Sequence, residues 1–82
     1  MKILYFSWLR EKIGVPEEEV DVKSETVNDL IKELIKIDQK YALAFEDLKV
    51  IRVAVDQKVI QDLNISINNV KEVAFFPPMT GG

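Results

Sequence analysis

The sequence contains no cysteine and no histidine, and it has only three glycines. Without thiols and imidazoles the chain can form no disulfide, no cysteine–histidine pair and no serine–histidine–aspartate triad, and most zinc sites are excluded. With glycine only at positions 14, 81 and 82, it can build neither a P-loop nor a glycine-rich dinucleotide-binding turn. The chain is therefore not expected to catalyse a reaction by itself.

Long hydrophobic runs are also missing. No apolar stretch approaches the roughly 18–20 residues that span a bilayer, and the N-terminus lacks a signal-peptide pattern, so no membrane partner is expected. A cysteine-free chain suits the cytoplasm. The net charge of −3 disfavours a nucleic-acid partner. The acidic run at residues 17–19 is interpreted as a solvated loop and strand entry rather than a metal site.

The remaining composition describes one small folded domain. The chain has 82 residues, of which 48% are hydrophobic, enough for one core but not for two. Apolar patterning predicts strands over residues 2–7, 19–23, 50–55, 58–60 and 71–76. Residues 63–69 fit either a strand or an ordered loop. The first strand is apolar at four successive positions, so it is expected to be central and covered on both faces.

Helices are predicted between these strands. A short helix covers residues 8–13 and is ended by Gly14. A longer helix begins at Thr26, which can cap it, while Asp29 completes a capping-box pattern. Its apolar stripe should pack on the sheet and consists of Val27, Leu30, Ile31, Leu34 and Ile35. Further helix or turn is expected within residues 41–48. This order predicts an α+β fold, a mixed sheet with one main helix packed across it.

The C-terminal stretch organises the chain. Residues 73–76 have the pattern of a buried strand, and Pro77 and Pro78 cannot donate to a sheet ladder, so the strand should stop there. Consecutive prolines favour an extended path away from the body. The chain thus divides into a domain at residues 1–76 and an extended, flexible tail at residues 77–82. The last four residues reach about 13 Å when extended, and they are Met79, Thr80, Gly81 and Gly82.

The Gly81-Gly82 end has two interpretations. It can be an incidental chain end. Alternatively, a tip without Cβ atoms can enter a channel too narrow for other residues. The α-carboxylate of Gly82 could then be activated as a mixed anhydride and passed to a nucleophile. On this hypothesis Gly82 is the candidate catalytic residue, and a bulky residue at Gly81 should block transfer without disturbing the fold.

Phe75 and Phe76 must point to opposite faces of the sheet. One should lie in the core, and the other should face outward beside the tail, where an exposed aromatic side chain could anchor a partner. Alternation does not say which is which. Phe75 is grouped here with the tail residues as a candidate partner-binding residue. The alternative is that both rings are buried, one on each face.

The ending FFPPMTGG at residues 75–82 resembles the C-terminal signature of the small, sulfur-carrier subunits of molybdopterin synthase. That family is ubiquitin-like and has a β-grasp fold. The resemblance extends over the whole chain, through its length, its element order and the stretch at residues 54–57. One departure is the sequence NVK at residues 69–71, where the family often has Asp-Gly-Asp. Because Val70 does not comfortably adopt φ > 0, we expect another turn type with Asn69 left-handed.

The resemblance implies a function for the tail. A separate ubiquitin-activating-like adenylyltransferase would use ATP to adenylate the Gly82 carboxylate, and a sulfur donor enzyme would convert it to a thiocarboxylate. The loaded tail would enter the large synthase subunit and give sulfur to the pterin precursor of the molybdenum cofactor. The chain itself would bind no metal or cofactor. The tail residues would present the carboxylate, with clearance from Gly81, direction from Pro77 and Pro78, and reach from Met79 and Thr80.

Two other functions stay open at this point. The tail could form an isopeptide bond with a lysine, as ubiquitin-like modifiers do, or carry sulfur for thiamine synthesis or transfer-RNA thiolation. The chain could also be a non-enzymatic β-grasp binding module whose Gly-Gly end has no role. The last possibility predicts that removal of Gly82 leaves function unchanged.

Overall fold

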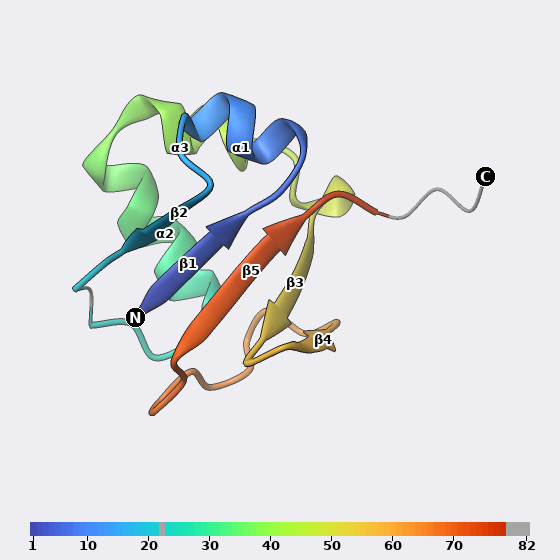
Figure 1. Cartoon of the computed structure of the whole chain (residues 1–82). Helices are drawn as coiled ribbons and strands as arrows, with labels where there is room; N and C mark the ends of the chain where they lie inside the picture. The colour runs from blue at the N-terminus through green and yellow to red at the C-terminus, as the bar shows by residue number, and fades with distance from the viewer. Residues whose placement is uncertain (22, 79–82) are drawn as a thin grey trace.

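The computed structural model describes residues 1–21 and 23–78. In chain order the elements are β1 (Lys2–Tyr5), α1 (Trp8–Ile13), β2 (Glu17–Glu19), α2 (Val27–Ile37), α3 (Gln39–Ala44), the 3-10 helix η1 (Leu48–Val50), β3 (Arg52–Val55), β4 (Lys58–Ile60) and β5 (Glu72–Phe76). Figure 1 shows the strands in front and α2 behind them, with α1 and α3 together at one end.

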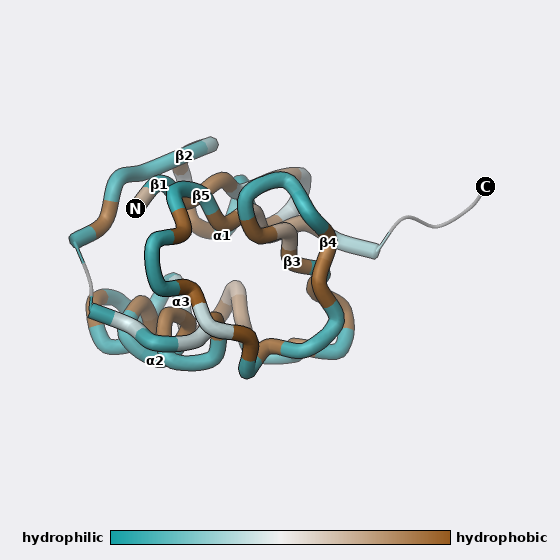
Figure 2. The backbone as a smooth tube through the Cα atoms, turned by 90° about the horizontal axis from the view of Figure 1, so that it is seen from below, coloured by the Kyte–Doolittle hydropathy of each residue, from teal (hydrophilic) through white to brown (hydrophobic). Residues whose placement is uncertain are grey.

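The strands form one five-stranded mixed sheet in the order β2-β1-β5-β3-β4. The first and last strands, β1 and β5, are parallel and adjacent at its centre, and the other pairs are antiparallel. Figure 2 shows α2 and α3 on one side of this sheet. The predicted α+β fold is confirmed: it is a ubiquitin-like β-grasp, in which the main helix crosses one face of a mixed sheet.

The core lies between the sheet and the helices. It is built from alternate strand residues, because successive side chains of a strand point to opposite faces. Phe75 of β5 is its central aromatic residue: its ring stacks on that of Tyr5 at 6.2 Å between centroids and meets Phe45 edge-on at 4.9 Å. The fully buried large side chains are Tyr5, Phe75, Ile3, Leu9, Ile13, Leu30, Leu34, Ile67, Val27, Val53 and Val73.

The predicted helix boundaries are found at α1 and at the start of α2. Gly14 follows α1 with φ 96°, and its amide donates to Arg10 O at 2.7 Å, as in a left-handed C-cap. Thr26 precedes α2, and its Oγ1 accepts from the Asp29 amide at 3.1 Å. Among the hydrogen bonds of the described residues, the reciprocal bond from the Thr26 amide to the Asp29 carboxylate is not formed. Ile35, expected in the buried stripe, is 37% exposed.

The second strand was predicted too late in the chain. It occupies Glu17–Glu19 rather than residues 19–23, although three glutamates have low strand propensity. Cross-strand charge explains the shift: Lys2 Nζ lies 3.0 Å from Glu17, and the Met1 ammonium lies 2.9 Å from Glu19. Glu18 turns to the other face and accepts from the Tyr41 hydroxyl at 2.7 and 2.8 Å. Pairing with β1 thus fixes a strand that local sequence does not favour.

Two further strand predictions are corrected. β1 is not covered on both faces, since Leu4 is only half-buried and Phe6, just after the strand, is 46% exposed. β3 begins at Arg52 rather than at residue 50, because Leu48–Val50 form η1, capped by the Asp47 carboxylate. The segment at residues 63–69 is a loop held at the start of α2 by an isolated bridge between Thr26 and Ser66 and by a hydrogen bond from the Asn28 amide to Leu63 O at 2.9 Å.

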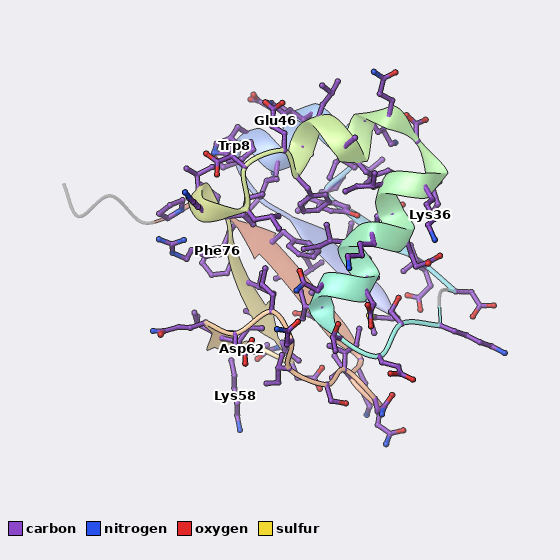
Figure 3. The ribbon with its side chains drawn as sticks, turned by 180° about the vertical axis from the view of Figure 1, so that it is seen from behind. Trp8, Lys36, Glu46, Lys58, Asp62 and Phe76 are labelled. Carbon is purple, nitrogen blue, oxygen red and sulfur yellow. The ribbon has the colours of Figure 1, made fainter. Side chains whose placement is uncertain are left out.

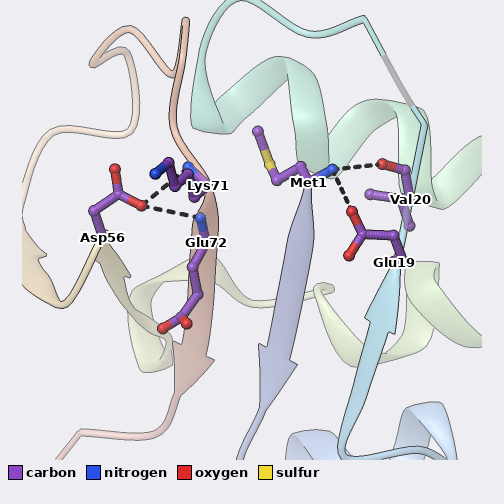
Figure 4. A network of polar contacts seen from close by, with 6 residues as sticks. All are labelled: Met1, Glu19, Val20, Asp56, Lys71 and Glu72. Atoms are coloured by element: carbon purple, nitrogen blue, oxygen red, sulfur yellow. Dashed lines mark hydrogen bonds and ion pairs between the residues drawn. The ribbon is translucent and has the colours of Figure 1, made fainter.

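In the turns at one end of the sheet, non-glycine residues adopt positive φ angles. Asn69 has φ 65°, which confirms the left-handed turn predicted before β5. Asp56 and Gln57, between β3 and β4, have φ 47° and 71°. Asp56 Oδ1 accepts from the amides of Lys71 and Glu72, each at 3.0 Å (Figure 4). This carboxylate therefore joins the β3–β4 turn to the first residue of β5 and fixes where that strand begins.

Candidate functional site

The candidate site is the end of the sheet from which the tail continues. Because β1 and β5 are parallel, their C-terminal ends lie at the same edge. β5 ends at Phe76, where the prolines were predicted to stop it, and Pro77 and Pro78 follow as half-buried residues. The remaining predicted site residues, Met79, Thr80, Gly81 and Gly82, lie outside the described residues. The structure thus locates the base of the tail.

The two phenylalanines at this base have different environments. Phe75 is 0% exposed and belongs to the core cluster, so its assignment as a partner-binding residue is wrong. Phe76 points to the opposite face and is half-buried. Figure 3 shows Phe76 and Trp8 at the same end of the molecule. Phe76 is therefore the aromatic residue at the base of the tail that a partner can contact.

Phe76 is part of an apolar surface on the face of the sheet away from α2. Leu4, Ala74 and Ala54 pair in register across β1, β5 and β3, and Val59 of β4 pairs with Ala54. Phe6 continues the alternation of β1, and its amide still donates to Phe75 O at 3.1 Å. We call this surface the open-face patch, and its residues are Leu4, Phe6, Ala54, Val59, Ala74 and Phe76.

Two large side chains of the open-face patch, Phe6 and Val59, are exposed; Leu4 and Phe76 are half-buried, and the small residues Ala54 and Ala74 are buried. Val59 is 66% exposed and Phe6 46% exposed, whereas Ala54 and Ala74 are 9% and 7% exposed. Contiguous exposed apolar side chains are typical of protein–protein contact surfaces. The small central residues keep the patch shallow, so a partner can approach the strands closely beside the tail. Sequence reasoning missed Phe6 and Val59; the available signal for Phe6 was its place two residues after Leu4 in the alternation of β1.

The two ends of the open-face patch differ in their charged groups. At its far end Lys2 pairs with Glu17, and the hydrogen bond and charge of that carboxylate raise the pKa of Lys2. At the tail end Arg52 is the Cα partner of Phe76 in the β3–β5 ladder. Its Nη1 donates to the carbonyl oxygens of Lys49 and Ile51, at 3.0 and 3.3 Å. A cation therefore stands beside the last residue before the prolines.

Other polar groups of the described chain support the fold rather than form a catalytic site. The Met1 ammonium donates to Glu19 Oε1 and to Val20 O, which fixes the N-terminus on β2 (Figure 4). Burial, followed by the hydrogen bond to Glu18, raises the pKa of Tyr41 to about 12. Burial, followed by the influence of the Glu18 carboxylate, also raises the pKa of Tyr5, although the Tyr5 hydroxyl has no partner at hydrogen-bonding geometry among the described residues.

Metal and membrane sites were sought in the same part of the chain. Within residues 1–21 and 23–78, no three histidine, cysteine or acidic side chains are grouped so that they could hold a metal ion. No helix in these residues combines the length and apolar character needed to cross a bilayer. The chemistry available at the candidate site is thus that of an apolar contact surface, one guanidinium and the tail that follows Pro78.

Sequence comparison gives relatives along the whole chain. The ThiS family matches residues 3–82. The molybdopterin synthase sulfur carrier subunit of Escherichia coli (strain K12) is 37% identical over 82 residues, which cover 100% of this chain and 99% of that protein. The similarity therefore extends over the whole chain, including residues 79–82, which the structure does not describe.

Structure comparison gives the same fold. SAMP1, the small archaeal modifier protein 1 of Haloferax volcanii, matches with a TM-score of 0.73 and 26% identity, over 100% of this chain and 98% of that one. A chain in the complex of subunits 1 and 2 of the molybdopterin-converting factor from Helicobacter pylori 26695 matches with a TM-score of 0.62 and 20% identity, over 99% and 96%. At 20% identity the second likeness concerns the fold alone.

Proposed function

The chain belongs to the ThiS family, and from this premise we propose that it is the sulfur-carrier subunit of a molybdopterin synthase. The observation that carries the proposal is the full-length similarity to the sulfur carrier subunit of Escherichia coli. The chain's own residues fit this function, because β5 ends beside an apolar contact surface and continues through Pro77 and Pro78 toward a Gly-Gly end.

The reaction we propose takes place at the Gly82 carboxylate. A carboxylate is a poor acceptor for a sulfur nucleophile, so a ubiquitin-activating-like adenylyltransferase first joins it to the AMP of ATP, with release of pyrophosphate. A sulfur donor enzyme then supplies the nucleophile that displaces AMP, and one carboxylate oxygen leaves with the AMP. The product is a thiocarboxylate; its sulfur passes to the pterin precursor, and water replaces that sulfur at the acyl carbon and restores the Gly82 carboxylate. Because activation consumes ATP, we place these steps in the cytoplasm.

The large synthase subunit is the partner we propose for the loaded tail. A complex of subunits 1 and 2 is known for the converting factor of Helicobacter pylori, whose chain shares this fold. In the present chain Phe76 and the rest of the open-face patch would rest on that subunit, and residues 77–82 would enter it as an extended tail. Gly81 and Gly82 lack Cβ atoms, so they would pass through a narrow channel to the precursor.

Intact-mass measurement tests the sulfur-carrier proposal. The chain is incubated with ATP, its matching adenylyltransferase and a sulfur source, and its mass is compared before and after. We expect a shift equal to one exchange of oxygen for sulfur, and no shift in a variant that lacks Gly82. A Lys36→Ala variant serves as the matched control, because Lys36 lies in α2, away from the open-face patch, and the tail tip is unchanged. Absence of the shift with a competent adenylyltransferase would contradict the proposal.

A second candidate function is protein modification. It is favoured by the likeness to SAMP1, whose name describes a small archaeal modifier. In that case the activated Gly82 carboxyl would form an isopeptide bond with the ε-amine of a lysine. Mass spectrometry of tryptic digests of cellular proteins would then find residues 72–82 (EVAFFPPMTGG), the peptide that follows Lys71, attached to lysines, and this remnant would be lost when Gly82 is deleted. A sulfur carrier without modifier activity would leave no such remnants.

A further inference from the structure

Arg52 is a cation on the open face that forms no ion pair with any described residue. On the same face Lys2 lies 3.0 Å from Glu17. Among the described residues, no carboxylate lies within 4 Å of the Arg52 guanidinium. The Arg52 side chain is nevertheless held in place, because its Nη1 donates to two carbonyl oxygens at the end of η1.

Some N–H groups of the Arg52 guanidinium are not used in hydrogen bonds to the described residues. Arginine has five N–H donors, and those used by Arg52 within the described residues are on Nη1. Nε and Nη2 make no hydrogen bond to the described residues, and together they form the fork that binds a carboxylate through two parallel bonds. Since the side chain is already ordered, a carboxylate would bind it with little further loss of rotamer entropy.

The position of Arg52 connects it to the tail. It is the Cα partner of Phe76, and paired strands lie about 5 Å apart, so any protein that receives the tail must pass close to this cation. Arg52 also lines a hollow of about 390 Å³ between η1, β3 and β4, together with apolar side chains that include Leu48, Val59 and Leu63. The open-face patch and this hollow therefore border Arg52 on both sides.

We propose that Arg52 is a specificity-determining contact that binds an aspartate or glutamate of the subunit receiving the tail. The inference rests on the proposed function, since it presumes a protein that takes up the tail. A protein carboxylate fits better than a phosphate polymer, because the chain has a net charge of −3 and the cation is bordered by apolar surface. Contact with that surface would remove water from the ion pair and strengthen it.

Binding of three variants and the wild-type chain to the cognate large subunit tests the proposal. We expect Arg52→Glu to weaken binding by roughly 30-fold or more, since it puts a carboxylate against a carboxylate. Arg52→Lys should lie between Arg52→Glu and wild type, because lysine keeps the charge but loses the fork. Lys58→Glu is the matched control: it makes the same charge change at the far end of the β3–β4 hairpin, where Figure 3 shows Lys58 apart from Phe76. It should stay within about 3-fold of wild type.

The outcomes separate this inference from the proposed function. If wild type binds and Arg52→Glu binds equally well, with both folded by circular dichroism, the Arg52 contact is wrong and the sulfur-carrier function stands. If Lys58→Glu weakens binding as much as Arg52→Glu, the effect is one of net charge and the specific contact is again refuted. Failure of the wild-type chain itself to bind would overturn the proposed partner and the contact together. If the change of one acidic residue of the large subunit to lysine restores binding of the Arg52→Glu variant, that residue carries the carboxylate that Arg52 binds.

Discussion

The two faces of the sheet carry the same kinds of residue for different purposes. On the face toward the helices, Tyr5 and Phe75 are at most 1% exposed and stack on each other. On the open face, Phe6 is 46% exposed and Phe76 is half-buried beside the tail. Each aromatic residue of the first face is thus followed in the chain by one of the second. The strands β1 and β5 hold the fold together through one residue and offer a contact surface through the next.

This comparison shows why aromatic content alone does not identify a contact residue. Phe75 and Phe76 are chemically identical and adjacent, and they differ only in which face of β5 they occupy. The helices determine which of the two rings is buried, because α2 and α3 cover one face of the sheet and leave the other open (Figure 2). A substitution at either position should therefore affect one property, stability or binding, and largely leave the other.

The largest effect is predicted for Phe75→Ala. Removal of a fully buried ring should lower the free energy of unfolding by about 3–5 kcal/mol, a large part of the about 4–12 kcal/mol expected for a domain of this length. Phe76→Ala should cost less than about 1 kcal/mol but weaken binding to the large subunit. Urea denaturation and a binding titration measure the two effects. Equal loss of stability in both variants would show that the open face also belongs to the core.

A smaller effect is predicted for Tyr41→Phe, on the helix side of the sheet. The Tyr41 hydroxyl donates to both oxygens of Glu18 and so ties α3 to the edge strand β2. Loss of a hydrogen bond to a charged group should lower the free energy of unfolding by about 1.5–3 kcal/mol. Glu18→Gln is the matched control, since it keeps an acceptor and should cost less. A Tyr41→Phe variant as stable as wild type would mean that this tie between α3 and β2 contributes nothing.

A structural feature could be predicted from the sequence where neighbouring residues in the chain cause it, and could not where distant residues do. Gly14 ends α1 and Pro77 ends β5 through their own backbone chemistry, so both boundaries could be read from the chain. The position of β2 could not, because it depends on partners supplied by Lys2 and the N-terminus. The roles of Phe75 and Phe76 also depend on which face the helices cover. Arg52 was missed because its position beside the tail exists only after β3 pairs with β5.

A pH dependence is predicted on the helix side of the sheet. The pKa of Tyr41 is raised to about 12 in the folded chain, chiefly by burial, from an ordinary value of 10.0. Above pH 10 the unfolded chain loses this proton first and is favoured. The stabilisation is therefore complete below pH 10 and is lost as pH rises toward 12. Thermal unfolding from pH 8 to 12 measures it, and Tyr41→Phe should flatten the decline. An equally steep decline in that variant would assign the effect to other groups.

The smallest effect is predicted for Tyr5→Phe, which tests whether the helix side needs the shape of its aromatic residues or their polar groups. The Tyr5 ring is buried against Phe75, but its hydroxyl is buried without a hydrogen-bond partner among the described residues. An unpaired buried hydroxyl carries a desolvation cost, so its removal should leave the free energy of unfolding unchanged or raise it by up to about 1 kcal/mol. Tyr5→Ala, which also removes the ring, should instead cost about 3–5 kcal/mol. If Tyr5→Phe were destabilised by more than about 1 kcal/mol, the hydroxyl would have a partner in solution, and the core would depend on a polar contact as well as on packing.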